Sequence, residues 1–261
     1  MLGRREYAAE FVGMALLLLV GCSAVCADFA TRSPVLSAIP DANLRRLLTG
    51  IIFAGTATAI VYSPLGRRSG GHLNPAVTLA FLKLGKISPR SAAIYVAVQF
   101  AGALTGAALV LAIWHRWATS VRVGATLPKH GGPVAAVAAE VAATFLLVSL
   151  ILSFVDRPRL MPFTAAAAGA LVAFFVFVEA PVSGTSLNPA RTLGPAVVGS
   201  TFTDLWIYFL GPPLGALIAT LLYQRRRSGV ACGKLFHTDA RRRGPRAARR
   251  GVVRGSRSTG Q

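Results

Sequence analysis

The sequence predicts an all-α membrane protein with six transmembrane helices and two re-entrant half-helices, arranged as an inverted repeat. Three observations lead to this fold class. Hydrophobic residues make up 54% of the 261-residue chain and charged residues only 14%, whereas soluble domains carry about 25% charged residues. Six apolar stretches are long enough to cross a bilayer. Two short stretches contain Asn-Pro-Ala and lie at corresponding places between those spans.

A spanning helix needs roughly 20 apolar residues, and six stretches come close to that length. They are expected to be helices, because a strand in lipid would leave its backbone groups unpaired. The second stretch is short, so its helix is expected to start near Asn43. The predicted spans cover residues 8–27, 47–62, 91–114, 134–155, 160–178 and 205–223.

Each Asn-Pro-Ala stretch is expected to be a loop that turns into a short helix. Residues 69–78 and 183–192 share the frame Ser-Gly-x-x-Leu-Asn-Pro-Ala. Asparagine is a good helix cap and proline is favoured at the first helical position. The apolar runs after the motifs, 77–82 and 193–198, are too short to span a bilayer. One copy means little, because Asn-Pro opens many turns, but two copies 114 positions apart indicate a duplication.

The two halves of the chain correspond beyond these motifs. The first span opens with Ala-Ala-Glu at Glu10, and the fourth contains Ala-Ala-Glu at Glu140. Three spans per half is an odd number, so the halves must have opposite orientations in the membrane. Such inverted repeats place their functional site near the bilayer midplane, between broken helices. The repeats are expected to cover about 7–114 and 134–224, within a channel domain of residues 1–224.

Basic residues are distributed unevenly and predict the topology. The tails and connections on one side hold 21 Lys and Arg, against six on the other, which places both termini in the cytoplasm. Twelve of these residues lie after Gln224. Residues 225–261 are therefore expected to be a basic, disordered cytoplasmic tail that touches anionic lipid. Although the net charge is +19, its concentration beside a span argues against nucleic acid as a partner.

Enzymatic chemistry has no visible basis in the sequence. It contains no Cys/His spacing typical of zinc sites, no nucleophile elbow, no P-loop and no dinucleotide fingerprint. We expect no cofactor, no metal and no catalytic residues.

The paired motifs and the spans around them resemble the aquaporin, or major intrinsic protein, family. The resemblance covers Tyr7 to about Gln224. It implies a passive channel in the cell membrane for water, with glycerol, urea or a similar small neutral solute as further candidates, and with protons and ions excluded. It also implies a homotetramer in which each subunit holds its own pore.

In such a channel the two half-helices meet with their positive N-terminal ends near the membrane centre. The pore residues implied are Asn74, Pro75, Ala76, Asn188, Pro189 and Ala190. The two asparagines would both cap their helices and offer amide donors to passing water. The backbone expected to line the pore belongs to Gly70, Gly71, His72, Leu73, Gly184, Ser186 and Leu187.

Arg191 is the strongest single candidate, because an arginine at membrane depth is costly unless it faces water or a partner. In the family it belongs to an aromatic/arginine constriction. Alignment adds Val176, Thr185 and a second-span residue, which is Phe53 if a one-residue insertion is counted and Ala54 if it is not; we favour Phe53. Water-selective members carry histidine at the position of Val176.

Thr192 stands where glycerol-type members carry aspartate, which argues against a standard glycerol facilitator. Residues 181–184 and 193–196 are more similar to the plant nodulin-like members and related bacterial ones. His72 is expected at the cytoplasmic mouth, either as a wall residue or as a gate.

Two other functions are open at this stage. Glu10 and Glu140 would form a proton relay in a proton-coupled transporter, whereas in the aquaporin family such glutamates support the re-entrant loops. The basic tail would be the active part of a nucleic-acid- or lipid-binding scaffold. Neither alternative explains the matched half-helices.

Overall fold

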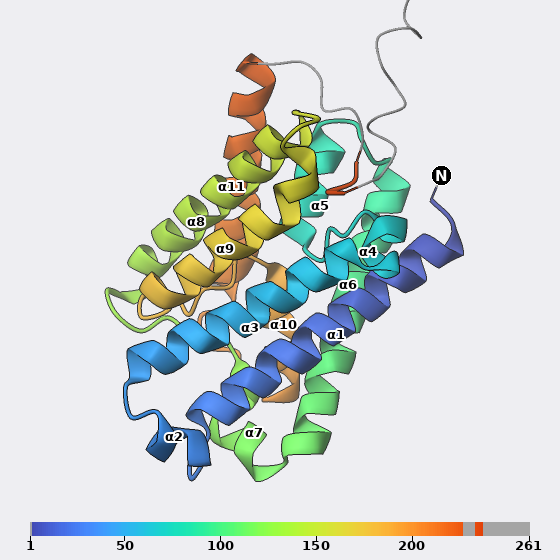
Figure 1. The fold of residues 1–261 in the computed structure, drawn as a ribbon. Coiled ribbons are helices and arrows are strands. Elements are labelled where there is room, and N and C mark those ends of the chain that lie inside the picture. Colours follow the sequence, from blue (N-terminus) through green and yellow to red (C-terminus); the bar gives the residue numbers. More distant parts are fainter. Residues whose placement is uncertain (1, 227–232, 237–261) are drawn as a thin grey trace, which may run out of the picture.

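The computed structural model describes residues 2–226 and 233–236. Within them, six helices are long and apolar enough to cross a membrane, as the sequence predicted. Figure 1 shows them packed side by side around two shorter helices. They are α1 (Arg4–Phe29), α3 (Ala42–Tyr62), α6 (Pro89–Trp114), α8 (Gly132–Val155), α9 (Thr164–Val178) and α11 (Trp206–Arg226).

The helix ends follow local capping rather than the apolar runs alone. The second span starts at Ala42, close to the expected Asn43, because the carboxylate of Asp41 accepts the backbone N–H of Asn43 at 2.7 Å. The fifth span begins with a 3-10 turn, Met161–Phe163, before α9 starts at Thr164. Hydropathy had placed the start of this span at residue 160.

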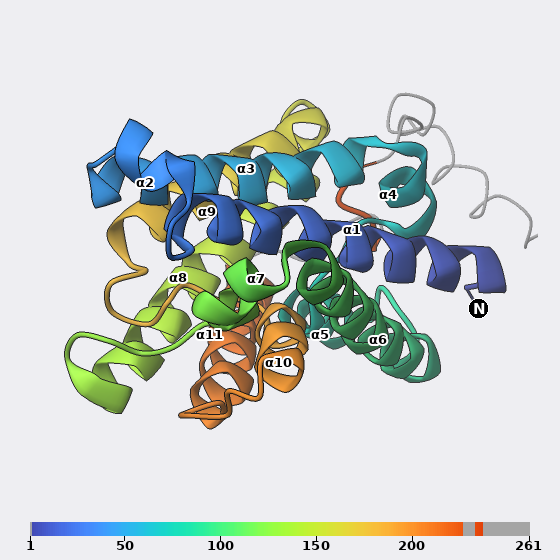
Figure 2. The same cartoon turned by 90° about the horizontal axis from the view of Figure 1, so that it is seen from below.

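Both half-helices form where the Asn-Pro-Ala motifs predicted them. They are α5 (Pro75–Lys83) and α10 (Pro189–Val198). Each packs against its own half and also against a long helix of the other half, α5 on α11 and α10 on α6. Figure 2 shows α10 between α11 and α6, with α5 next to it. These contacts between the halves join the two repeats into one bundle.

Glycines permit the closest helix contacts in both halves. A Cβ at Gly106 on α6 would lie 2.4 Å from the carbonyl oxygen of Ala15 on α1. A Cβ at Gly215 on α11 would lie 2.4 Å from the carbonyl oxygen of Val141 on α8. Small residues at such contacts let membrane helices approach closely, and here they create the same α1–α6 and α8–α11 pair in each repeat.

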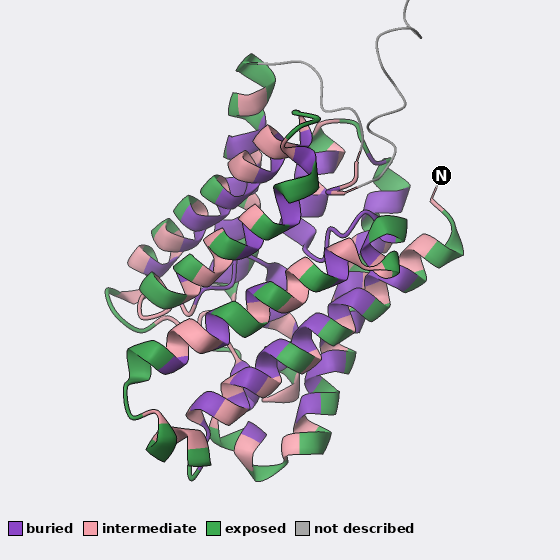
Figure 3. Ribbon diagram, viewed as in Figure 1, coloured by how far each residue is buried: buried purple, intermediate pink, exposed green. Residues whose placement is uncertain are grey.

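The outer surface of the bundle is apolar while polar side chains are buried inside it. Figure 3 shows exposed residues along the outward faces of the long helices and buried ones facing the interior. Large exposed apolar side chains include Leu16, Val20, Ile52, Phe174 and Leu221. A surface of this kind fits a lipid environment, in which polar groups are placed inside the bundle.

Short helices connect the spans at both ends of the bundle. They are α2 (Pro34–Ala38), α4 (Pro64–Ser69), α7 (Arg116–Ser120) and the 3-10 helix η1 (Arg122–Gly124). The helices α7 and η1 lie in the link between the two repeats. The start of α1 and the end of α11 lie at the same end of the bundle (Figure 1), as six spans require.

The expectation of a disordered tail from residue 225 is wrong for part of that tail. Arg225 and Arg226 continue α11. Residues 233–236, which we call the tail segment, pack against the bundle because Leu235 finds a buried apolar site there. The expected contact of the tail with lipid falls mainly on residues 227–232 and 237–261, which lie outside the described residues.

Candidate pore

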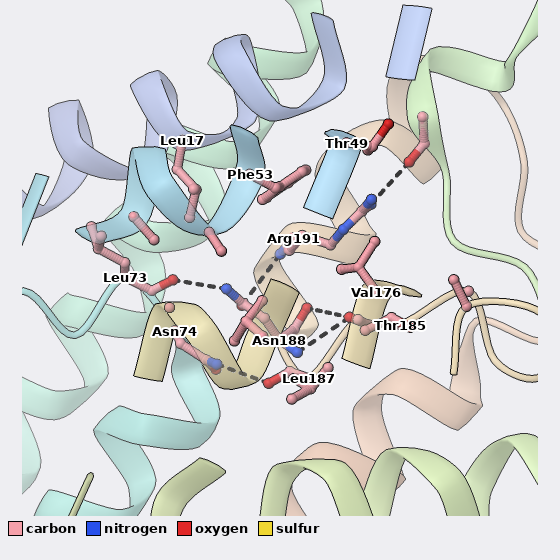
Figure 4. A pocket seen from close by; sticks show the side chains of 18 of the residues that line it. Leu17, Thr49, Phe53, Leu73, Asn74, Val176, Thr185, Leu187, Asn188 and Arg191 are labelled. Carbon is pink, nitrogen blue, oxygen red and sulfur yellow. Dashed lines mark hydrogen bonds between the residues drawn. The ribbon is translucent and has the colours of Figure 1, made fainter. Parts of the chain in front are cut away.

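A cavity of about 480 Å³ lies inside the bundle and is lined by both repeats. Its walls include residues of α1, α3, α8, α9, the two re-entrant loops and the link between the repeats. Arg46 and Lys129 lie at one end, and Leu235 of the tail segment lines the other. We call the end nearest Arg4 and Arg226 the terminus-side mouth. Figure 4 shows the central part of this cavity.

Asn74 and Asn188 meet in the middle of the cavity and bond each repeat to the other. The side-chain amide of Asn74 donates to the carbonyl of Leu187 at 2.8 Å, and that of Asn188 donates to the carbonyl of Leu73 at 2.8 Å (Figure 4). Their side-chain oxygens cap α5 and α10 by accepting the N–H groups of Ala76 and Ala190. A carboxamide nitrogen carries two hydrogens, so each has a second one for a molecule in the cavity.

The loops before the two asparagines have a strained backbone. Leu73 and Leu187 adopt positive φ angles of 49° and 54°, and Thr185 one of 53°. Non-glycine residues rarely adopt this region, and such strain persists only where the surroundings fix it. These loops therefore need support from the bundle.

Buried carboxylates supply that support in both repeats. Glu140 accepts the N–H groups of Ser186 and Leu187, each at 2.7 Å. Glu10 accepts the N–H of Leu73 and the amide of Gln99, the latter at 2.8 Å. Both glutamates are fully buried, and neither is among the residues that line the cavity. They hold the loops rather than contact the pore.

Two tyrosines complete the support, and the sequence analysis missed them. Tyr95 donates its hydroxyl to the carbonyl of Ser69 at 2.6 Å, and Tyr208 does the same to the carbonyl of Ser183. Both rings are fully buried. The sequence contains a sign of this pair, because Tyr95 and Tyr208 are 113 positions apart. The same offset separates Gly102-Ala103 in the third span from Gly215-Ala216 in the sixth.

Arg191 lines the cavity, and its guanidinium contacts neutral groups of the protein. Its guanidinium donates to the carbonyl of Gly124 at 2.9 Å and lies 5.0 Å from the centre of the Phe53 ring. A cation over an aromatic face is attracted to it. Figure 4 shows Phe53, Val176 and Thr185 around the same part of the cavity. Ala54 also lines the cavity, but it is the Phe53 ring that faces the arginine.

Glu179, which the sequence analysis did not single out, fixes the loop residue of this cluster. Its carboxylate accepts the hydroxyl of Thr185 and the N–H of Ser183, the latter at 3.2 Å. The sequence could have pointed to Glu179, because it comes directly after α9 and a carboxylate at the end of an apolar span needs a partner. Thr192 donates its hydroxyl to Ser186 at 2.6 Å, so its side chain also supports the re-entrant loop before Asn188.

The remaining predicted site residues fall into two groups, with Gly70 as an exception. Gly71, His72, Leu73, Gly184, Ser186 and Leu187 line the cavity. Pro75, Ala76, Pro189 and Ala190 do not; they are buried and form the first turns of the half-helices. Gly70 was predicted to line the pore, and this is wrong, because its carbonyl faces the tail segment and accepts the N–H of Leu235 at 3.0 Å.

His72 forms part of the wall near the terminus-side mouth. It is 4% exposed, and its ring stacks on Phe81 with 4.9 Å between ring centres. Nδ1 lies 3.1 Å from the hydroxyl of Thr78. Nε2 lies 3.0 Å from the carbonyl oxygen of Gly233. Since a carbonyl only accepts, Nε2 is the donor of this bond.

The chain is similar to known proteins over most of its length. The family model described as Major intrinsic protein matches residues 2–223. Aquaporin NIP3-1 of Arabidopsis thaliana is 33% identical over 84% of this chain and 66% of its own length. Aquaporin NIP1-3 of Oryza sativa subsp. japonica is 33% identical over 82% of this chain and 71% of its own length.

A solved structure shares the fold. The aquaglyceroporin from Plasmodium falciparum superposes with a TM-score of 0.71, covering 85% of this chain and 95% of its own, at 21% identity. The family match spans the six membrane helices up to Tyr223, both half-helices and the two asparagine motifs. The chain therefore belongs to the major intrinsic protein family, whose members, the aquaporins, are membrane channels and not enzymes.

Proposed function

We propose that the protein conducts water and, in addition, a small neutral carbon-bearing solute such as glycerol or urea. The observation that carries this proposal is the composition of the cluster around Arg191. Its other members, Phe53, Val176 and Thr185, offer no imidazole. The aliphatic Val176 occupies the position where a histidine would add bulk and a hydrogen-bonding group, which leaves room for carbon beside the arginine donors.

Ions and protons are excluded at the midplane of the proposed channel. The N-termini of α5 and α10 point toward each other, and each carries about half a positive charge. The amides of Asn74 and Asn188 would both donate to one passing oxygen, which interrupts a chain of proton-conducting waters. Exclusion by the positive ends of half-helices is a known property of aquaporin-type pores, so the mechanism is general to such channels.

The buried glutamates favour a passive channel over a proton-coupled transporter. A proton relay needs carboxylates that reach the transport path. Glu10 and Glu140 have no exposed surface, and their oxygens accept N–H groups of the loops. A scaffold that acts through its basic tail would not require matched half-helices or the cavity between them.

We further propose that the channel is a homotetramer in the cell membrane with both termini in the cytoplasm. The excess of Lys and Arg on the side of the termini supports this orientation. The outward apolar faces of the spans are available for lipid and for neighbouring subunits. Each chain encloses its own cavity, so assembly would multiply pores rather than create one. In this orientation the terminus-side mouth opens to the cytoplasm.

Stopped-flow light scattering on proteoliposomes tests the proposed function. Water, glycerol and urea should each cross faster than in empty liposomes, and a dissipated proton gradient should leave these rates unchanged. A pH-sensitive dye inside the same vesicles should report no added proton leak. Uptake that saturates and stops without a proton gradient would instead establish the transporter.

A further inference from the structure

The tail segment, residues 233–236, is anchored at the terminus-side mouth by three sets of polar contacts. The N–H of Leu235 donates to the carbonyl of Gly70 at 3.0 Å. His72 donates from Nε2 to the carbonyl of Gly233 at 3.0 Å. The ammonium of Lys234 donates to the carbonyls of Arg67 and Arg68, at 3.1 and 3.2 Å, where α4 ends. Cations are favoured at the C-terminal end of a helix.

Two apolar side chains of the segment complete the contact. Leu235 is only 5% exposed, belongs to the buried apolar cluster that includes Val61 and Val77, and lines the cavity. The ring of Phe236 lies edge-on to Tyr62 at 5.2 Å and under the guanidinium of Arg67 at 5.3 Å. The segment therefore reaches into the cavity with one leucine, while the ring of Phe236 packs on α3 and α4 outside the cavity lining.

Neither the internal repeat nor the hydrogen bonds that support the re-entrant loops explain why this segment is docked at the mouth. The corresponding loop of the other repeat is bounded by the link between the repeats, where a Cβ at Gly184 would lie 2.9 Å from the backbone nitrogen of Leu127. That contact comes from the chain between two spans. The tail segment follows α11 and belongs to none of the six described spans, so it can leave its site without unfolding any of them.

We propose that the tail segment is a tethered plug that closes the terminus-side mouth, and that the channel opens when the segment leaves its site. Leu235 is the residue that obstructs the cavity, whereas Lys234, Phe236 and the backbone of Gly233 hold the segment in place. The binding site is formed by α4, the loop from Gly70 to His72 and the end of α3. This inference rests on the proposed conduction of water.

Two truncations separate the segment from the rest of the tail. A chain ending after residue 232 lacks the plug, whereas a chain ending after residue 236 keeps it and loses only residues 237–261. In liposomes with equal protein, the shorter chain should conduct water about tenfold faster, the change expected if the segment is docked about nine-tenths of the time. Equal permeability of the two truncations would overturn the proposal.

A point substitution tests the same site in the full chain. A Cβ at Gly233 would lie 2.8 Å from the carbonyl oxygen of Lys86, so Gly233→Val should push the segment off and raise the permeability as the shorter truncation does. Gly55→Val is the matched control, because a Cβ there meets nothing within 4 Å. A full chain that conducts equally with either substitution would contradict the plug.

Thiol labelling tests the plug without relying on conduction. Ile151 lines the cavity and belongs to the same buried cluster as Leu235. In a Cys232→Ser background, Ile151→Cys should react with a small water-soluble maleimide about tenfold faster in the chain ending after 232 than in the chain ending after 236. If no variant conducts but labelling shows this difference, the proposed function fails and the plug stands. Equal labelling rates would refute the plug even in a conducting channel.

Discussion

Asn74 and Asn188 each hold the loop of the other repeat. Each donates its side-chain amide to the carbonyl that precedes its partner, at 2.8 Å in both cases. The same two side chains cap the half-helices that carry them. One pair of residues therefore joins the repeats, starts both short helices and presents donors to the cavity.

Replacing Asn188 with alanine should destabilise the bundle, because it removes both the cap of α10 and the bond to Leu73. A lost cap costs about 1 kcal/mol and a lost hydrogen bond about as much, so we expect a loss of about 2 kcal/mol in the free energy of unfolding in detergent. The control is Asn43→Ala, since Asn43 is exposed near the start of α3. Equal losses for the two variants would show that Asn188 is not a structural link.

Asn188→Asp should separate the capping role from the donor role. An aspartate keeps an oxygen for the cap but cannot donate to the carbonyl of Leu73 when it is ionised. It also places a negative charge where the half-helix ends are positive. We expect proton leak into dye-loaded liposomes to rise while water still passes. An unchanged leak would mean that the midplane does not exclude protons by its charge.

Glu140→Gln should weaken the loop support. Ser186 and Leu187 donate to different oxygens of Glu140, and a glutamine keeps only one acceptor oxygen. Its NH2 group would therefore face one of these two N–H groups, which loses its acceptor. Leaving a buried donor without its partner costs about 1–3 kcal/mol, which denaturant unfolding in detergent would measure. Glu6→Gln is the control, because its carboxylate accepts the exposed N–H of Gly3 at the start of α1. If Glu140→Gln lowers the free energy of unfolding no more than the control does, Glu140 does not support the loop.

Mercurials should inhibit the wild-type channel weakly. All three cysteines, Cys22, Cys26 and Cys232, lie outside the two re-entrant loops. Cys22 and Cys26 are free but buried, and neither lines the cavity. Thr185 does line it, so Thr185→Cys should create strong inhibition that a thiol reductant reverses. Thr201→Cys, outside the cavity lining, is the control. Full inhibition of the wild type at a low concentration of the mercurial would show that the assignment of Thr185 to the constriction is wrong.

A reporter fused after Gln224 tests the proposed orientation. It should read as cytoplasmic, because the excess of basic residues lies on the side of the termini. A second reporter in the link, after Lys129, should read as external. The reverse pair of readings would contradict the orientation.

The sequence was most informative where structure depends on neighbours along the chain. Span lengths follow from the bilayer and caps from Asn-Pro, so all six spans and the starts of α5 and α10 were predictable. Contacts with distant backbone were not. The carbonyl of Gly124 that accepts from Arg191 has no side-chain signature. The choice between Phe53 and Ala54 depended on one inserted residue, and the 5.0 Å between Arg191 and the Phe53 ring favours Phe53.

The tail shows a different limit of the sequence. Its composition is that of a chain that cannot bury a core, which is why disorder was expected throughout. Leu235 is nevertheless buried, because the rest of the bundle supplies the pocket. Average composition does not reveal four residues whose binding site is formed by α4 and a re-entrant loop.

In the proposed channel, Val176 leaves room for a carbon-bearing solute beside Arg191. Val176→His adds a polar ring to the cavity, whereas Val178→His on the same helix places it on a surface that is 45% exposed. The deciding measurement is the ratio of glycerol to water permeability in proteoliposomes. We expect Val176→His to lower this ratio about tenfold and Val178→His to leave it unchanged, since one pocket group discriminates by about 10–200-fold. Liposomes that pass water but neither glycerol nor urea, both in the wild type and after Val176→Gly, would contradict the account.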